Sequence, residues 1–263
     1  MKSTLKVGGL LFVIAVCGLG FLFSPNDPFH VDMAKRFSGS SLQYPLGTDH
    51  MGRCILSRLL EGGKVTVGVV LLGSAIVFIL GMILGILAGQ VKSGKGILME
   101  SFLNAVTALP PVAYLIVFIG AWGNGVFTMV FAVTISLLLR LIKLIKTETA
   151  IELSKAYALC AVASGVSKPN LLFYHVAPNV MRDAIHYICL SCADMIVIIT
   201  GFSFIGLGLG DNVIDWGMMV SEARGFLIMK PEVMLYPVGA ILLCTLSFNL
   251  LAREIEKKGD AHA

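Results

Sequence analysis

Asp194 is the one carboxylate well inside a long apolar run of this sequence, and it is the first candidate for chemistry. A charge in the hydrocarbon of a bilayer is expensive, so an ionisable residue at that depth indicates a functional site by default. Two interpretations stay open: Asp194 faces a path for a cationic or metal-containing solute, or it makes a hydrogen bond between helices. Cys189 and Cys192 precede it, but no second ligand pair accompanies them, so their spacing does not indicate a zinc site.

The other reactive residue types do not form a catalytic set. The sequence contains no HExxH pattern, no paired intramembrane acids and no Ser, His and Asp combination at a common depth. It contains no GxxxxGKS/T segment, so it cannot bind ATP through a P-loop of its own. His50, His175 and His186 are nickel ligands by residue type alone. We therefore predict a protein that is not an enzyme and holds no metal or cofactor itself.

The composition predicts an all-α polytopic membrane protein. Hydrophobic residues make up 57% of the sequence, charged residues 14%, and the mean hydropathy is +0.88. Soluble domains are about one quarter charged. A chain of 263 residues can hold about six spans of ~20 residues each. The net charge of +4 is small and its basic residues lie in short loops, which argues against a nucleic-acid partner.

Six apolar runs are predicted to cross the membrane as helices. They cover residues 1–23, 65–90, 97–122, 126–145, 184–209 and 233–252. The first is predicted to be a retained span, because no small-x-small cleavage site stands out before Ser24. Gly81, Gly85 and Gly89 recur every four residues and predict a flat face on which another helix packs closely. Pro110 and the proline after it break the third run.

These spans predict a division of the chain. Residues 1–63 hold the first span and an extracytoplasmic linker, residues 64–256 form a transmembrane domain of five helices, and residues 257–263 are a cytoplasmic tail. Within the linker, residues 49–61 have apolar positions at helical spacing and predict an amphipathic helix on the membrane surface. With a cytoplasmic N-terminus, thirteen Lys and Arg residues fall inside and seven outside, as the positive-inside rule requires. Both termini are therefore predicted to lie in the cytoplasm.

The stretch Tyr157–Asn179 separates two spans on the predicted cytoplasmic side. It consists of a helix of small residues, a break at Gly165, a turn signal around Pro169 and a second helical run that is predicted to stop at Pro178. Small side chains let a partner groove approach closely, so the stretch predicts a docking site. The alternative is an ordinary cytoplasmic loop, which would need no dense run of small residues.

Four blocks of the sequence resemble a known family. Residues 46–53 (LGTDHMGR), followed by LSRL at 56–59, are similar to the LGTDxLGRDxLSRL signature of C-type permeases from dipeptide, oligopeptide and nickel ABC importers. Phe202–Gly208 and then Asp215–Gly217 are similar to the LSFLGLG and EWG blocks of that family. Ser247–Leu251 resembles its block at the end of the last span. The resemblance covers residues 40–256 and implies the six-helix fold of a type I importer permease.

The stretch Tyr157–Asn179 also resembles the EAA loop of these permeases, whose short coupling helix sits in a groove of the ATPase subunit. The glycine, the histidine and the Pro-Asn pair stand at the family spacing, whereas Leu159 stands at the position of the family glutamate. The resemblance assigns ATPase coupling to eight residues of a loop at 150–182: Tyr157, Leu159, Cys160, Ala161, Gly165, His175, Pro178 and Asn179.

The resemblance implies a transport subunit that works in an assembly. Its partners would be two ATPase subunits that bind the ATP, a second homologous permease subunit, an extracytoplasmic substrate-binding protein and membrane lipid. With Asp194 as the intramembrane acid, the predicted substrate path comprises Asp194, Ser203 and Pro110, and the predicted docking residues for the binding protein are Asp49, His50, Arg53 and Trp216.

The substrate and the class of transporter keep alternatives. A peptide, a nickel ion or a metal–chelator complex all fit as substrate, and Asp194 with His50 favours the metal. An ion-coupled secondary transporter would show repeated broken helices, and here the double proline occurs once. An integral-membrane enzyme is the least favoured class.

Overall fold

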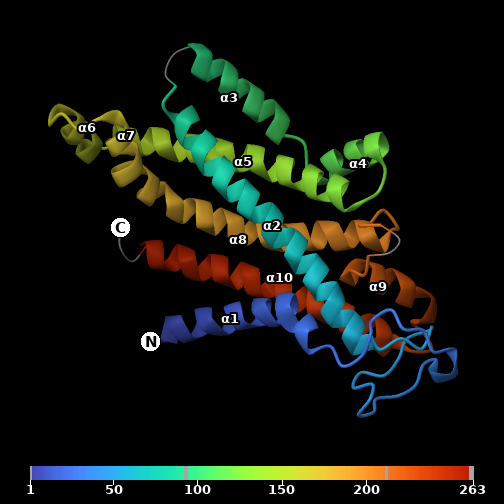
Figure 1. Ribbon diagram of the computed structural model, residues 1–263. Coiled ribbons are helices and arrows are strands. Elements are labelled where there is room, and N and C mark those ends of the chain that lie inside the picture. Colours follow the sequence, from blue (N-terminus) through green and yellow to red (C-terminus); the bar gives the residue numbers. More distant parts are fainter. Residues whose placement is uncertain (1, 92–93, 211–212, 261–263) are drawn as a thin grey trace. The chain divides into compact units, whose positions relative to one another are not determined.

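The computed structural model describes residues 2–91, 94–210 and 213–260 as helices joined by loops (Figure 1). The last three residues of the predicted tail lie outside this description. The α-helices are α1 (Lys2–Leu19), α2 (Ile55–Gly89), α3 (Gly94–Thr107), α4 (Pro111–Trp122), α5 (Val126–Ser154), α6 (Ala156–Ala163), α7 (Lys168–Asn170), α8 (Ala177–Phe204), α9 (Trp216–Ala223) and α10 (Pro231–Asp260). Short 3₁₀ turns cover Gly20–Phe23 (η1), Met33–Lys35 (η2) and Arg224–Phe226 (η4), and a π-helical turn, η3, covers Leu171–Val176. The predicted all-α class is confirmed.

Among the described residues, five helices are long and apolar enough to cross a membrane. A sixth span results if α3 and α4 are taken as one broken helix, which bends by 78° at its break. Pro110 lies in that break, and Pro111 is the first residue of α4, where a missing backbone N–H costs nothing. The predicted interruption of the third run by two prolines is therefore confirmed.

The predicted amphipathic helix at residues 49–61 is wrong. The chain forms a turn before Ile55, and α2 then runs without interruption for 35 residues. Gly62 and Gly63, which favour a break by propensity, are held in the helix by close packing. A Cβ added to Gly63 would lie 2.1 Å from the Cys17 carbonyl oxygen, and one added to Gly62 would lie 3.0 Å from the Trp216 ring. Tertiary contact thus overrides the local preference for a helix end.

The prediction that the second helical run stops at Pro178 is also wrong. Lys168–Phe204 forms one helical rod of 37 residues, in which the π-helical turn η3 is followed directly by α8. Pro178 is the second residue of α8. The wide i→i+5 turn before it leaves no regular α-turn for the proline ring to disrupt, so the helix continues.

The glycine face of α2 packs as predicted. A Cβ on Gly81 would lie 2.5 Å from the Leu141 side chain, one on Gly85 would lie 2.6 Å from Ile145, and one on Gly89 would lie 2.6 Å from Thr149. The three partners recur every four residues on α5, so two ridges of period four meet. Only glycine lets α2 and α5 approach this closely.

The chain forms two compact units. Unit 1 comprises Met1–Leu71, Ile119–Val130 and Cys192–Leu251, and unit 2 comprises Leu72–Phe118, Phe131–Ser191 and Ala252–Ala263. Unit 1 contains α9 and the long loop before α2, and its apolar cluster of Ile55, Ala223 and Val233 joins the starts of α2 and α10 to α9. Unit 2 contains the glycine face of α2 and the segment Lys155–Asn179, which we call the hairpin segment.

Candidate functional site

The hairpin segment has a defined helix end at Gly165. The Val166 N–H donates to the Ala161 carbonyl at 3.1 Å and the Gly165 N–H to the Val162 carbonyl at 3.0 Å. This pair of bonds is a Schellman motif, which requires a left-handed residue after the helix. Gly165 supplies it with φ +82°, and no other atom would lie within 4 Å of a Cβ there. The glycine is therefore needed for the turn itself, not for contact within the chain.

A polar network closes the base of the hairpin segment. The Tyr157 hydroxyl donates to Glu152 Oε2 at 2.6 Å, and Asn179 Nδ2 donates to the Tyr157 oxygen at 3.2 Å and to the His175 carbonyl at 2.8 Å. Lys155 forms an ion pair with the same glutamate. Burial, and the bond to Glu152, raise the pKa of Tyr157. Residues from the end of α5, from α6 and from the start of α8 are thus tied together, which fixes the direction in which α6 projects.

The hairpin segment, which includes α6 and α7 in Figure 1, also contains exposed apolar residues beyond this network according to their accessible surface. Leu159 is 60% exposed and Val162 is 56% exposed, three residues apart on α6. Phe173 and Tyr174 are 74% and 76% exposed on η3. Of the other predicted coupling residues, Cys160, His175 and Pro178 are exposed and Ala161 is half-buried.

Sequence reasoning missed two parts of this site. It did not single out Glu152, because this residue lies before the stretch that resembles the family loop. It also missed the exposed aromatic pair at 173 and 174, although two aromatic residues in a polar segment were a usable signal. Large exposed apolar side chains of this kind typically indicate an interaction surface.

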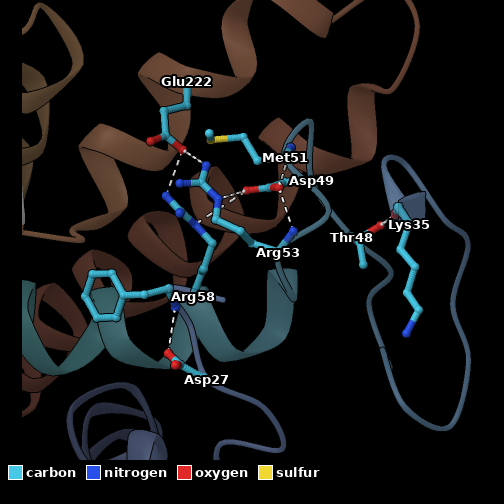
Figure 2. Close-up of polar contacts among 9 residues, drawn as sticks. Asp27, Lys35, Thr48, Asp49, Met51, Arg53, Arg58 and Glu222 are labelled. Atoms are coloured by element: carbon cyan, nitrogen blue, oxygen red, sulfur yellow. Dashed lines mark hydrogen bonds and ion pairs between the residues drawn. The ribbon is translucent and has the colours of Figure 1, made fainter. Parts of the chain in front are cut away.

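A second polar site lies in unit 1, where four charged side chains meet (Figure 2). Arg53 Nε lies 2.7 Å from Asp49 Oδ2. The Nη2 atoms of Arg53 and Arg58 each lie 2.7 Å from Glu222 Oε2. The Arg58 side chain is 2% exposed and the Arg53 side chain 10%. Glu222 reaches down from α9 to Arg58 on α2 and to Arg53 in the turn before α2. The ion-pair network therefore joins two segments more than 160 residues apart.

The same place brings three potential metal ligands together. One ligand atom each from Asp49, His50 and Glu222 lies within 4.8 Å of the others. Arg53 already donates to both carboxylates, however, and Arg58 donates to Glu222, so two positive charges offset two negative ones. This balance favours an ion-pair network over a cation site. The His50 ring stacks on Phe226 with 5.2 Å between centroids, and burial lowers the pKa of His50, which favours the neutral ring.

Trp216 begins α9 in the interior of unit 1. It is 1% exposed, and its indole N–H donates to the Leu59 carbonyl at 2.9 Å. Asp215 caps the helix by accepting from the Gly217 and Met218 N–H groups, and burial raises the pKa of its carboxyl. Asp49, Arg53 and Trp216, three of the four residues predicted to dock a binding protein, are thus buried and bonded within the chain. Their side chains offer a partner almost no surface and instead shape the loops around them.

Two of the predicted path residues, Asp194 and Ser203, do not share one surface of unit 1. Asp194 is exposed on α8, whereas Ser203 is 4% exposed and packs against Gly208 and Gly217. Nine residues separate the two, which places them on opposite faces of an α-helix with 100° per residue. Ser203 lines a pocket of about 230 Å³ beside α9. Pro110 is exposed and belongs to unit 2. Asp194 is therefore the one of the three whose side chain faces out of its unit along a membrane-spanning helix.

Comparison with known proteins decides what kind of membrane protein carries these sites. The sequence matches the family described as binding-protein-dependent transport system inner membrane component over residues 81–258, more than half of the chain. The chain belongs to this family. The permease is therefore a multi-pass membrane subunit of an ATP-driven importer and functions with ATPase and binding-protein partners. Membership confirms the predicted family and does not favour the secondary transporter or the enzyme.

Individual relatives cover nearly all of the permease. It is 30% identical to the di/tripeptide transport system permease protein of Pseudomonas aeruginosa over 93% of its own chain and 84% of the relative. It is 26% identical to the nickel transport system permease protein of Escherichia coli strain K12 over 100% of its chain and 94% of the relative. It is also 26% identical to the glutathione transport system permease protein of Pectobacterium atrosepticum, over 95% and 85%.

Proposed function

We propose that the hairpin segment is the surface on which a partner ATPase docks, and that α6 carries the contact. The observation that supports this is the pair of exposed apolar residues Leu159 and Val162 on a helix whose base is fixed by the Tyr157 network. The family glutamate is replaced by Leu159, so the contact is apolar at the position where an ion pair would be expected. The ATPase groove facing Leu159 is accordingly apolar.

The proposed assembly contains two ATPases, this permease and a second homologous permease subunit. Both termini of this chain then lie in the cytoplasm, as the distribution of Lys and Arg favours. The binding protein delivers substrate on the opposite side, to the loops of unit 1. ATP is bound and hydrolysed by the ATPases, and their closure moves α6 and with it α5 and α8, which the network ties to α6. The permease itself contributes no catalytic residue and no cofactor.

The proposed substrate carries a positive charge. Asp194 supports this, because a carboxylate exposed on an apolar helix is costly against lipid and is expected to face protein or a water-filled path. The ammonium group of a short peptide and a nickel ion both complement that charge, and permeases named for each are among the relatives. We propose Asp194 as the residue of the path that selects for this charge, with Ser203 on the opposite face of α8.

Co-purification tests the docking proposal. Leu159→Asp is expected to reduce the ATPase recovered with the tagged permease at least tenfold, because a charge would enter an apolar groove. Val31→Asp is the matched control, since Val31 is 45% exposed in the loop before α2 and should leave recovery unchanged. Undiminished ATPase recovery with Leu159→Asp would contradict the docking proposal. Uptake of a dipeptide and of Ni²⁺ by the Asp194→Asn permease tests the path. Uptake of both substrates at the wild-type rate would remove Asp194 from it.

A further inference from the structure

Three consecutive apolar side chains stand out of unit 1 in the turn before α10. Leu227 is 46% exposed, Ile228 99% and Met229 72%, and we call these residues the apolar tip. Three large apolar neighbours without cover indicate an interaction surface. We propose that the apolar tip is a membrane-interface anchor that inserts among lipids with anionic head groups.

The length of α10 places the tip at the level of the membrane surface. α10 begins at Pro231, and no charged residue occurs from 233 to 252, between Glu232 and Arg253. These 20 residues, at about 1.5 Å each, span about 30 Å, which is the thickness of the hydrocarbon core. The edge of the hydrocarbon therefore falls near Glu232. Ile228 lies only four residues before it, within the interfacial layer.

The exposed face of α10 continues this surface into the bilayer. Leu235, Leu242 and Leu246 are 60%, 64% and 48% exposed. They are spaced by seven and four residues, so they form one stripe along the helix. Since this stripe belongs to the charge-free part of α10, lipid is its natural contact, and the apolar tip is the next exposed apolar group along the chain.

The base of the tip is rigid, so that its side chains are presented before any lipid arrives. The Met229 and Lys230 N–H groups both donate to the Phe226 carbonyl, at 3.0 and 2.8 Å. The Phe226 ring is held between His50, on which it stacks, and Phe37, which it meets edge to face with 5.2 Å between centroids. A preformed turn loses little conformational freedom when it inserts, which favours binding.

Basic side chains surround the tip and specify the lipid. Arg224, three residues before the tip, is exposed, and the Arg36 guanidinium lies 5.7 Å from the centre of the Phe226 ring. Lys230 follows the tip and lies 3.5 Å from Glu232, its ion-pair partner. The three cations Arg36, Arg224 and Lys230 outnumber the carboxylate of Glu232, so these four groups carry a net positive charge. Cations beside an apolar wedge strengthen binding to anionic head groups.

Lipid quenching of an introduced tryptophan tests the proposal on the full-length chain in liposomes. Ile228→Trp is compared with the wild type, whose Trp122 and Trp216 provide the background, and with Leu42→Trp as control. Leu42 is 104% exposed in the loop before α2, 13 residues before that helix begins, whereas Ile228 lies three residues before α10. We expect lipids brominated near the head group to quench Ile228→Trp at least twofold more than the wild type. Leu42→Trp should instead be quenched by aqueous acrylamide.

The lipid class and the other occupants are arms of the same experiment. Replacing anionic by zwitterionic lipid should reduce the excess quenching of Ile228→Trp at least twofold. Equal acrylamide access at 228 and 42, with no excess lipid quenching, would overturn the proposal. Shielding of residue 228 only after the binding protein or the second permease is added would also overturn it and assign the tip to that partner. Met229→Trp serves in the same way if Ile228→Trp does not fold.

Discussion

Glu222→Gln should destabilise the permease far more than the loss of one partly exposed charge would suggest. The substitution keeps the side-chain volume but leaves Asp49 as the one carboxylate facing two guanidinium groups, of which Arg58 is 2% exposed. Breaking a buried ion pair from one side costs about 3–5 kcal/mol. Because the Glu222 side chain is 23% exposed, water offsets part of this, and we expect a loss of about 2–3 kcal/mol.

The expected loss has a direct readout. At 1.4 kcal/mol per decade, the ratio of unfolded to folded chains rises about 30- to 140-fold. For a chain of this size the apparent Tm should fall by about 4–12 °C, measured by thermal unfolding of the purified permease in detergent followed by size exclusion. Glu232→Gln is the control, since Glu232 is 45% exposed and lies 3.5 Å from Lys230, a surface pair worth about 0–1 kcal/mol.

A double variant separates charge balance from packing. Adding Arg53→Gln to Glu222→Gln leaves Asp49 with Arg58 and should recover part of the lost stability, because the surplus positive charge is removed. The reasoning would be refuted if Glu222→Gln lowered the Tm no more than Glu232→Gln did. It would also be refuted if the double variant lost the sum of the two single effects.

Three further outcomes follow from the geometry. Gly85→Ala should lower the free energy of unfolding by about 1–3 kcal/mol, because its Cβ would lie 2.6 Å from Ile145. The control Gly68→Ala, whose Cβ would have no atom within 4 Å, should leave the free energy of unfolding unchanged or raise it by up to ~1 kcal/mol through helix propensity. Similar Tm values for the two variants would contradict close packing of α2 on α5. Tyr157→Phe should keep ATP hydrolysis in the assembled transporter but lower the substrate moved per ATP, because α6 loses the Tyr157 hydroxyl bonds to Glu152 and Asn179. Full coupling in Tyr157→Phe would count against a transmitting role for the network. Burial lowers the pKa of His50 from its ordinary 6.5, so below about pH 6.5 the unfolded chain binds a proton that the folded chain does not, and stability falls as the pH falls. His50→Gln should therefore reduce the difference in Tm between about pH 7.5 and pH 5.5. An unchanged difference would show that His50 does not cause it.

The sequence predicted the features that depend on local composition or periodicity. The apolar runs locate the spans, the four-residue spacing of Gly81, Gly85 and Gly89 predicts the contact with α5, and Gly165 predicts the end of α6. These features are legible because each needs a residue type that few others can replace. A helix end in a left-handed conformation, for example, strongly favours glycine.

The features that escaped prediction depend on partners distant in sequence. Gly62 and Gly63 suggest a break until Trp216, more than 150 residues later, packs over them. Asp49 and Arg53 suggest exposed docking residues until Glu222 arrives on α9 and Arg58 on α2. Nothing in the spacing of charges along a chain indicates which of them will be buried together, because burial is decided by the tertiary fold.

The rod formed by Lys168–Phe204 has a mechanical consequence. At about 1.5 Å per residue it is about 55 Å long, so it exceeds the thickness of the hydrocarbon core by nearly twofold. A continuous helix of that length can transmit a displacement or a rotation from one of its ends to the other. The π-helical turn η3 interrupts its α-helical hydrogen bonding, and tightening the i→i+5 bonds there to i→i+4 would rotate the Lys168 end of the rod by about 100° relative to α8. This turn therefore lies beside α6, the proposed docking helix, near the Lys168 end of the rod.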